Sequence, residues 1–227
     1  MEISHKFLVV LLSFLAASTS VRGGCTNLSW RTRSHLDSMG IKIPDDYCYI
    51  KDIGVYKLHT DLANWNEARE ICKKEGAHLA ILNSRREAEL LGDMFKNSDL
   101  KNKGPQQGNG VFIGFHDLYQ EGKFVTIFDD LLEETGYNTW SRQWGGQPDN
   151  GQKVGLVIEA QNCGALAFDS ELDDVNCSWK LGFICEIPMR PLVLSEISKS
   201  YSKKLYDQNK DMQSSCNGNN KSRSRDY

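Results

Sequence analysis

Side chains that carry oxygen are concentrated between Asp129 and Asp174. This segment contains ten carboxylates and only two basic residues, Arg142 and Lys153. Neighbouring carboxylates repel one another unless a cation screens them, and Ca²⁺ prefers a flexible set of oxygen ligands. The pattern therefore predicts a calcium site in this segment, while a solvated acidic surface is the alternative that charge alone leaves open.

Patterns typical of catalysis or of zinc binding do not occur in the sequence. There is no Gly-x-Ser-x-Gly, His-Glu-x-x-His or Cys-x-x-Cys motif, and the five histidines are scattered: His5, His35, His59, His78 and His116. We therefore expect a binding protein rather than an enzyme. A hydrolase that uses one of these histidines is the remaining catalytic alternative.

The composition is that of an ordinary globular protein. Of the 227 residues, 40% are hydrophobic and 25% are charged, which favours a single domain and excludes a collagenous or wholly disordered chain. The 27 basic and 30 acidic residues give a net charge of −3. A nucleic-acid partner is not expected, because such proteins carry a strong excess of positive charge.

The first residues predict a secreted protein. Residues 7–17 are apolar except for Ser13, and the small residues Ser18-Thr19-Ser20 follow. This pattern is typical of a secretory signal peptide, here residues 1–20 with an approximate cleavage point, and a buried N-terminal helix is the alternative. A membrane span needs roughly 20 apolar residues, so we expect no transmembrane segment and an extracellular location.

The remaining chain divides into three parts by composition. Residues 21–47 form an N-terminal segment, residues 48–187 contain most of the apolar pattern, and residues 188–227 form a polar, basic tail. Leu194, Ile197, Tyr201 and Leu205 follow one another at helical spacing in the tail. They predict an amphipathic helix that packs on the domain, pairs two chains or touches an anionic glycolipid. Glycosylation sequons begin at Asn27 and Asn220, and a third at Asn176 lies beside a cysteine.

Two helices and a set of strands are expected in the middle part. Asn64 and Ser84 each precede a helical apolar pattern and have a glutamate three residues later, as in a capping box. Short apolar runs at 111–115, 164–168 and 181–185 predict strands. The order of elements favours an α+β fold. Four tryptophans are expected in the core or as loop anchors: Trp65, Trp140, Trp144 and Trp179.

Seven cysteines in a secreted chain predict disulfides. Because the number is odd, at least one thiol is free or bonds another chain, and Cys216 in the polar tail is the candidate.

Within residues 48–187, a series of motifs resembles the C-type lectin domain. The motifs are Trp65-Asn66-Glu67-Ala68 with Cys72, Glu75-Gly76-Ala77-His78-Leu79-Ala80, Asn83-Ser84, Phe112-Ile113-Gly114-Phe115, Glu121-Gly122-Lys123-Phe124, Trp144, Gln147-Pro148-Asp149-Asn150, Asn162-Cys163, Cys177 and Gly182-Phe183-Ile184-Cys185-Glu186. The segment 56–60 also looks like that of secreted insect lectins called immulectins or hemolymph lipopolysaccharide-binding proteins. The resemblance implies two helices, antiparallel strands and a long calcium-binding loop.

The same resemblance implies the disulfide pairs Cys72 with Cys185 and Cys163 with Cys177. Cys25 and Cys48 then remain as a third pair.

Carried over by position, the principal calcium ligands and sugar-binding residues are Gln147, Asp149, Gln161, Asp173 and Asp174. Gln147 and Asp149 flank Pro148, which is cis in the family. Gln161 stands where the family usually has Glu, and Glu159 is an alternative ligand. The order Gln-Pro-Asp implies galactose-type sugars, although residues 150–162 contain no aromatic ring for a sugar to stack on. An auxiliary calcium would involve Asp117, Glu121, Asn150 and Asn162, for which ordinary loop hydrogen bonding is the alternative.

These features suggest a secreted, calcium-dependent lectin that binds microbial glycans, including lipopolysaccharide, in innate immunity. The alternative is a lectin-like protein that binds a protein partner without calcium or sugar. A homo-oligomer is left open, and pairing of chains would strengthen weak single-site binding through avidity.

Overall fold

The computed structural model describes residues 25–103, 109–151, 153–154, 157–189, 197–199, 202–203, 206 and 210. The helices are α1 (Trp30–Ser38), α2 (Trp65–Lys74) and α3 (Arg85–Lys96), with short 3₁₀ turns at Asp99–Asn102, Leu132–Glu134 and Gln143–Gly145. The strands are β1 (Cys25–Thr26), β2 (Cys48–Ile50), β3 (Gly54–Ala63), β4 (His78–Leu79), β5 (Gly110–His116), β6 (Val125–Thr126), β7 (Lys153–Val154), β8 (Val157–Ile158), β9 (Cys163–Ala167), β10 (Leu172–Val175) and β11 (Leu181–Ile187). The α+β expectation is confirmed.

One mixed sheet organises the domain. Its strands follow the order β1-β2-β3-β11-β5-β9-β10, with β4 added beside β11 and β6 beside β5. The expectation of antiparallel strands is wrong for one pair, because β11 runs parallel to β5 where Phe183 lies opposite Phe112. Strand β11 comes last in the chain and enters the middle of the sheet antiparallel to β3, which sets its direction next to β5.

Both predicted helices begin where the sequence indicates. The Asn64 side chain accepts a hydrogen bond from the Glu67 N–H, the Glu67 carboxylate accepts one from the Asn64 N–H, and α2 follows. Ser84 caps α3 in the same position. These caps satisfy N–H groups that a helix end leaves without a partner inside the helix.

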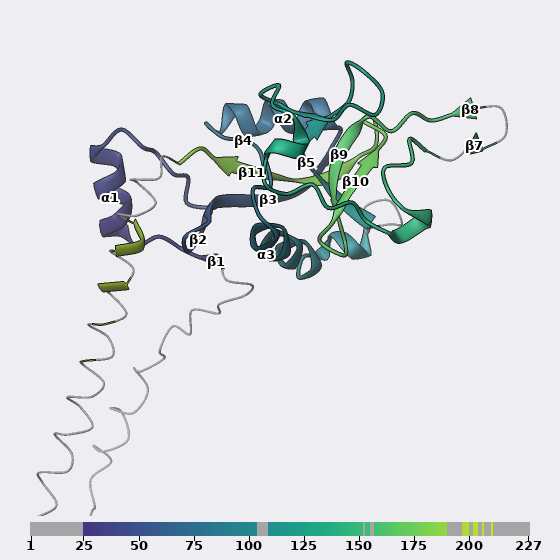
Figure 1. Ribbon diagram of the computed structural model, residues 1–227. Coiled ribbons are helices and arrows are strands. Elements are labelled where there is room, and N and C mark those ends of the chain that lie inside the picture. The colour runs from purple at the N-terminus through teal and green to yellow at the C-terminus, as the bar shows by residue number, and fades with distance from the viewer. Residues whose placement is uncertain are drawn as a thin grey trace, which may run out of the picture.

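The two helices cover opposite faces of the sheet (Figure 1). Trp65, Ala68 and Cys72 of α2 pack into one core cluster, and Ala88, Leu91 and Phe95 of α3 pack into the other. The strands supply both clusters because their side chains alternate between the faces. On β5, for example, Phe112 faces α2, whereas Val111 and Ile113 face α3.

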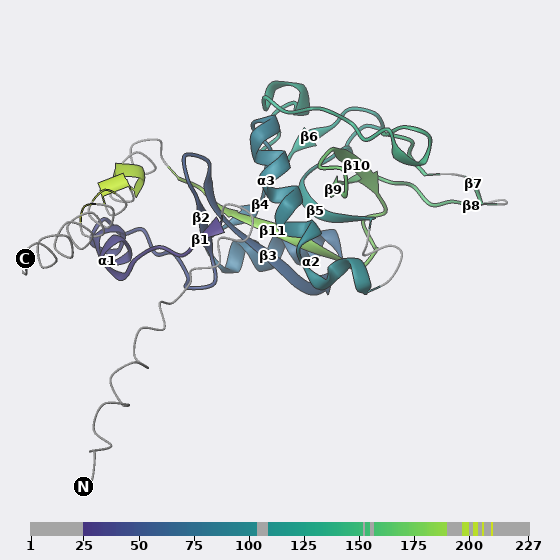
Figure 2. The same cartoon turned by 90° about the horizontal axis from the view of Figure 1, so that it is seen from below.

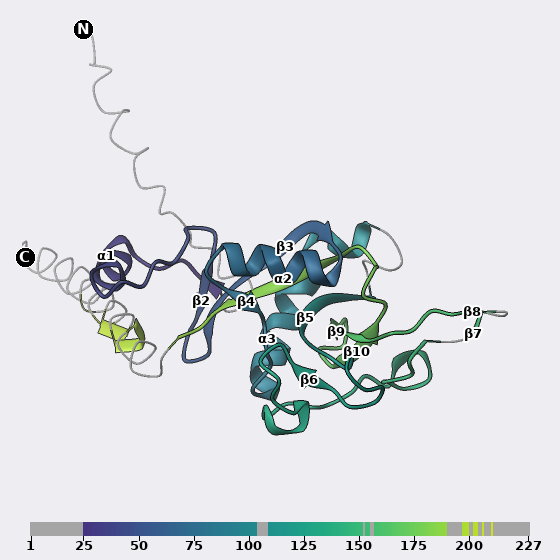
Figure 3. The same ribbon diagram turned by 90° about the horizontal axis from the view of Figure 1, so that it is seen from above.

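The N-terminal segment contains a helix that the sequence pattern did not indicate. Helix α1 begins after Ser29, whose side chain accepts from the Thr32 N–H, and it buries Leu36. It lies at one end of the molecule, and the β7–β8 hairpin projects from the other end (Figures 1, 2 and 3). Ile197 shares a core cluster with Leu36 and Ile43, so this tail residue packs on the domain.

Three disulfides join Cys25 to Cys48, Cys72 to Cys185 and Cys163 to Cys177, as expected. The sequon residue Asn27 is exposed. The signal peptide, Cys216 and Asn220 lie outside the described residues. Among the described helices, none has the length and apolar character needed to cross a membrane.

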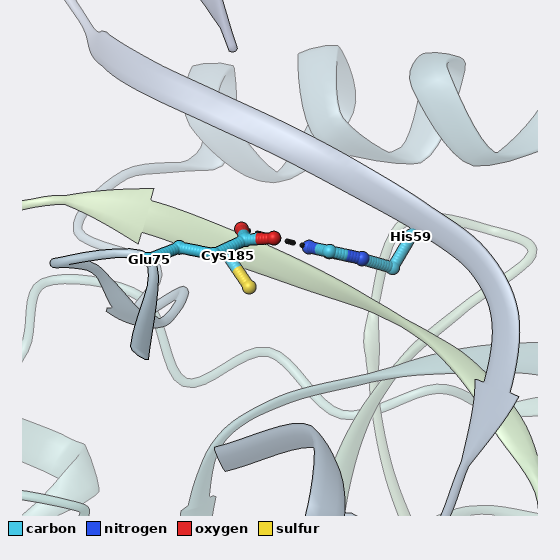
Figure 4. A group of neighbouring side chains, drawn as sticks. All are labelled: His59, Glu75 and Cys185. Atoms are coloured by element: carbon cyan, nitrogen blue, oxygen red, sulfur yellow. Dashed lines mark hydrogen bonds and ion pairs between the residues drawn. The ribbon is translucent and has the colours of Figure 1, made fainter. Parts of the chain in front are cut away.

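A polar network at the end of α2 ties three segments together. The Glu75 carboxylate accepts hydrogen bonds from the Tyr47 hydroxyl (2.7 Å) and from Lys57 Nζ (2.7 Å), and it lies 3.1 Å from His59 Nε2. Figure 4 shows His59 and Glu75 beside Cys185, a combination typical of metal sites. Because the Cys185 sulfur is bonded to Cys72, it is not a thiolate ligand, and the network is a structural one.

Replacing Glu75 by Gln should lower the free energy of unfolding by about 2 kcal/mol at neutral pH, because a charged acceptor with several donors is lost. Burial opposes ionisation of Glu75, but its bonds with Lys57 and Tyr47 hold its pKa below the ordinary 4.5. The stabilisation is therefore complete above pH 4.5 and is lost as the pH falls through the folded-state pKa. Urea unfolding at several pH values measures this, with the exposed Glu70→Gln as control. A difference from wild type that stays constant down to about pH 3 would contradict the assignment.

Candidate functional site

A closed turn precedes the Gln-Pro-Asp motif. Ser141 N–H donates to the carbonyl of Leu172 on β10, and Gln147 N–H donates to the carbonyl of Ser141. The Asp169 carboxylate accepts from the Ser141 hydroxyl (2.6 Å) and from the Gln143 amide (3.1 Å). The turn is therefore fastened to the β9–β10 hairpin, and it ends at the cis peptide bond between Gln147 and Pro148.

Trp144, which was expected in the core or as a loop anchor, lies at the tip of this turn and outside the core. Its side chain is 43% exposed, and its φ of 52° lies in the left-handed region. Because the turn bends through Trp144, Gly145 and Gly146, all at positive φ, it directs the ring outward. The other three tryptophans agree with the prediction: Trp65 is fully buried, and Trp140 and Trp179 are half-buried against the core clusters.

The Asp174 carboxylate holds the chain immediately after the cis bond. Its two oxygens accept hydrogen bonds from the N–H groups of Asp149 (3.0 Å) and Asn150 (2.8 Å). Asp149 in turn accepts from the N–H of Gly151 (2.9 Å). These bonds bring Asp149 to Asp174 even though 25 residues separate them in the sequence.

Gln161 joins the same group through Asn150, whose side-chain oxygen accepts the Gln161 N–H at 3.0 Å. Gly151, at φ 77°, allows the two sides of the β7–β8 hairpin to approach, because a Cβ there would lie 2.4 Å from the Glu159 carbonyl. The Glu159 side chain is exposed, whereas the side-chain oxygen of Gln161 is buried. Of the two alternative ligands, Gln161 is thus the one that points inward.

Two buried side-chain oxygens in this group accept no hydrogen bond from any described residue. They are Oε1 of Gln147 and Oε1 of Gln161. A buried polar atom without a partner costs roughly 1–3 kcal/mol, so such atoms usually indicate an interaction with water, an ion or a ligand. Both oxygens belong to residues that the family resemblance implied as calcium ligands.

The carboxylates of the group repel one another in a buried position. Asp173 and Asp174 are 6% and 1% exposed. Burial, together with the charges of Asp174 and Asp149, raises the pKa of Asp173 to about 7. Burial also raises the pKa of Asp174 to about 6, although the N–H groups of Asn150 and Asp149 oppose the shift.

The chemistry of these side chains is of the kind that Ca²⁺ prefers. The carboxylates of Asp149, Asp173 and Asp174 and the two unpartnered amide oxygens offer oxygen atoms only, and Ca²⁺ takes 6–8 oxygen ligands. A divalent cation beside these groups would offset the repulsion between the aspartates.

A second polar group lies at the start of the β5–β6 connection. Asn162 Nδ2 donates to Asp117 Oδ1 (3.1 Å) and lies 3.5 Å from Glu121 Oε2, while Asp117 Oδ2 accepts the Gly122 N–H. Burial and the charge of Asp117 raise the pKa of Glu121. The structure thus brings together three of the four residues named for an auxiliary calcium, while Asn150 lies with Asp174 and Gln161.

Three residues have roles in the site that were not assigned to them from the sequence: Asp169, Ser141 and Asn150. Asp169 was counted only as one of many carboxylates, and nothing in the local pattern marks Ser141. Asn150 was assigned to the auxiliary group, whereas it bridges Asp174 and Gln161. Their partners are about 11 to 28 residues away, so local spacing does not reveal them.

Residues 61–187, more than half of the chain, match the family model of the lectin C-type domain. The chain belongs to the C-type lectin domain family. The Kupffer cell C-type lectin receptor, a solved structure, has the same fold with a TM-score of 0.50 at 20% identity, and the alignment covers 69% of this chain and 89% of that one.

Two of the sequence relatives are named as a lipopolysaccharide-binding protein and a C-type lectin. The hemolymph lipopolysaccharide-binding protein of Periplaneta americana is 38% identical over 147 residues, which span 65% of this chain and 54% of that protein. Salivary C-type lectin 1 of Aedes albopictus is 29% identical over 126 residues, 55% of this chain and 76% of the relative. The match thus spans about half the length of the cockroach protein.

Replacing Ser141 by Ala should lower the free energy of unfolding by about 1–2 kcal/mol, because the hydroxyl donates to Asp169 and accepts from the Gln143 N–H. Urea unfolding measures the effect. The control is Ser178→Ala, which removes a hydroxyl from an exposed position and should cost less than about 0.5 kcal/mol. Equal stability of the two variants would show that Asp169 does not fasten the turn.

Proposed function

We propose that this protein is a secreted, calcium-dependent lectin that binds microbial surface glycans without altering them chemically. The observation that carries the proposal is the pair of buried, unpartnered amide oxygens of Gln147 and Gln161 in a group that already contains three aspartates. An oxygen-only, acidic and largely buried set of this kind suits Ca²⁺.

The bound ion would take two adjacent sugar hydroxyls as ligands, and the chain's own groups determine which sugar fits. The Gln147 amide offers N–H donors, and the carboxylates of Asp149 and Asp174 offer acceptors. Donors and acceptors on opposite sides of a pair of hydroxyls discriminate between sugars whose hydroxyls differ in orientation. The order Gln-Pro-Asp supports a preference for galactose-type sugars.

Two observations support a microbial glycan and an extracellular location. The relative from Periplaneta americana is named for binding lipopolysaccharide and for occurring in hemolymph. The three disulfides suit an oxidising compartment, as does the apolar N-terminal segment of a signal peptide. We infer lipopolysaccharide or another repetitive glycan as the target.

Asp149→Ala and Asp174→Ala should each weaken calcium binding by more than about 100-fold and abolish calcium-dependent retention on sugar resin, because each removes a carboxylate from the ion's ligand set. Calorimetry with Ca²⁺, followed by retention on galactose and mannose resins and elution with chelator, measures both effects. Asp61→Ala, at an exposed position on β3, is the control and should behave as wild type.

Normal sugar retention by either variant would contradict the assignment of these residues. If the wild-type protein takes up no calcium and is retained on neither resin, the proposal is wrong, and a protein ligand becomes the better hypothesis.

Gln161→Glu should tighten calcium binding by about tenfold, because it adds a negative charge at a buried ligand position. Glu159→Gln should leave the affinity unchanged, since the Glu159 side chain is exposed. Calorimetric titration of the two variants therefore distinguishes the alternative ligands. The opposite result, a loss of affinity only in Glu159→Gln, would assign the ligand role to Glu159.

A further inference from the structure

A hollow of about 420 Å³ lies beside the proposed calcium site. Its volume falls within the roughly 300–1,000 Å³ that is common for small-ligand sites. We call it the Trp140 hollow, and its lining residues belong to the β5–β6 connection, the 3₁₀ turn after β6 and the long loop: Gly122, Lys123, Phe124, Leu131, Leu132, Glu133, Asn138, Trp140 and Pro148.

Aromatic rings form one wall of the Trp140 hollow. The rings of Phe124 and Trp140 are tilted against each other with their centroids 4.7 Å apart. Both rest on the buried ring of Phe115, at 5.8 and 5.6 Å. Each is only half-buried, so part of their apolar surface faces the hollow. Rings held from behind offer a firm surface for the C–H face of a sugar.

Backbone hydrogen bonds fix the segments that carry the wall. The Leu132 N–H donates to the carbonyl of Phe124 (3.1 Å), which holds the 3₁₀ turn against the β5–β6 connection. On the other side, Thr139 and Ser141 both bond to Leu172 of β10, one on each side of Trp140. The hollow is therefore preformed, and binding would not require these segments to become ordered.

Three other lining residues are polar and exposed. Lys123 and Asn138 offer hydrogen-bond donors, and Glu133 and Asn138 offer acceptors. An apolar aromatic face combined with a rim of mixed donors and acceptors matches a sugar ring, which has a C–H face and hydroxyl groups at its edge.

The Trp140 hollow and the proposed calcium site are formed in part by the same segments of the chain. Pro148 lines the hollow and lies between Gln147 and Asp149, two of the proposed ligands. Leu172, which pairs with Trp140, is followed on β10 by Asp173 and Asp174. The hollow is thus next to the proposed ligands along two segments, the long loop and β10.

We propose that the Trp140 hollow is a second sugar-binding subsite, which takes the unit linked to the calcium-bound sugar. The inference rests on the proposed function, since it assigns the calcium site to the terminal sugar. With this subsite, the protein recognises at least a disaccharide rather than a single sugar.

The test compares monosaccharides with disaccharides by calorimetry of the full chain in Ca²⁺. The probes are galactose with lactose and melibiose, and mannose with its disaccharides. At least one disaccharide should bind about tenfold or more tightly than its terminal monosaccharide, because the second unit gains contacts at no further cost of orientation.

Asn138→Trp should fill the hollow and remove this gain, while calcium affinity and monosaccharide affinity remain as in wild type. Asn66→Trp is the matched control, because it places the same ring at an exposed position of α2 and should retain the gain. Should Asn138→Trp fail to fold, the double variant Lys123→Ala with Glu133→Ala removes polar contacts without adding bulk and should reduce the gain.

Two results would overturn the second subsite and leave the proposed function intact. One is monosaccharide binding with no gain for any disaccharide, and the other is a gain that the folded Asn138→Trp retains. Absence of calcium-dependent binding to every probe would overturn the proposed function and the second subsite together.

Discussion

Repulsion between adjacent buried carboxylates is the constraint on which the site depends. Asp173 and Asp174 lie on β10, in register with Ala165 and Gly164 of β9, so the sheet fixes the backbone that carries both carboxylates. Asp174 gains partial compensation from the N–H groups of Asp149 and Asn150, and the same two bonds position the chain after the cis peptide. The remaining negative charge is unusual for an interior position, and a cation of matching charge is the simplest way to stabilise it.

The sheet tolerates this electrostatic repulsion because helices cover both of its faces and disulfides cross-link its strands to neighbouring segments. Helices α2 and α3 bury opposite faces, and the Cys72–Cys185 disulfide joins α2 to the central strand β11. The Cys163–Cys177 disulfide closes the segment that contains β9 and β10. Long loops with little regular structure can therefore carry polar groups at defined positions, since the strands beneath them are rigid.

The loop region joins two kinds of surface that glycan binding needs. One is the acidic, oxygen-rich group around Gln147 and Asp149, which is suited to an ion. The other is the Trp140 hollow, with its half-buried rings and polar rim. Pro148 separates the two, and Trp144 projects from the turn just before it. The same turn thus sets the position of both surfaces, because Ser141, Asp169 and Leu172 fasten it to the β9–β10 hairpin.

Features that depend on neighbours in the sequence were predictable. The caps at Asn64 and Ser84, the apolar faces of α2 and α3, and the three main strand runs follow from local propensity and periodicity. The family resemblance supplied the cysteine pairs and the order of the proposed ligands.

Only the tertiary structure decided that Gln161 points inward rather than Glu159, that Trp144 faces solvent, and that β11 lies parallel to β5. Helix α1 was not predicted from the sequence, because only one of its residues is buried and its apolar face is therefore not evident from the pattern. These outcomes rest on contacts between distant segments, and a spacing pattern carries no information about which distant atoms will meet.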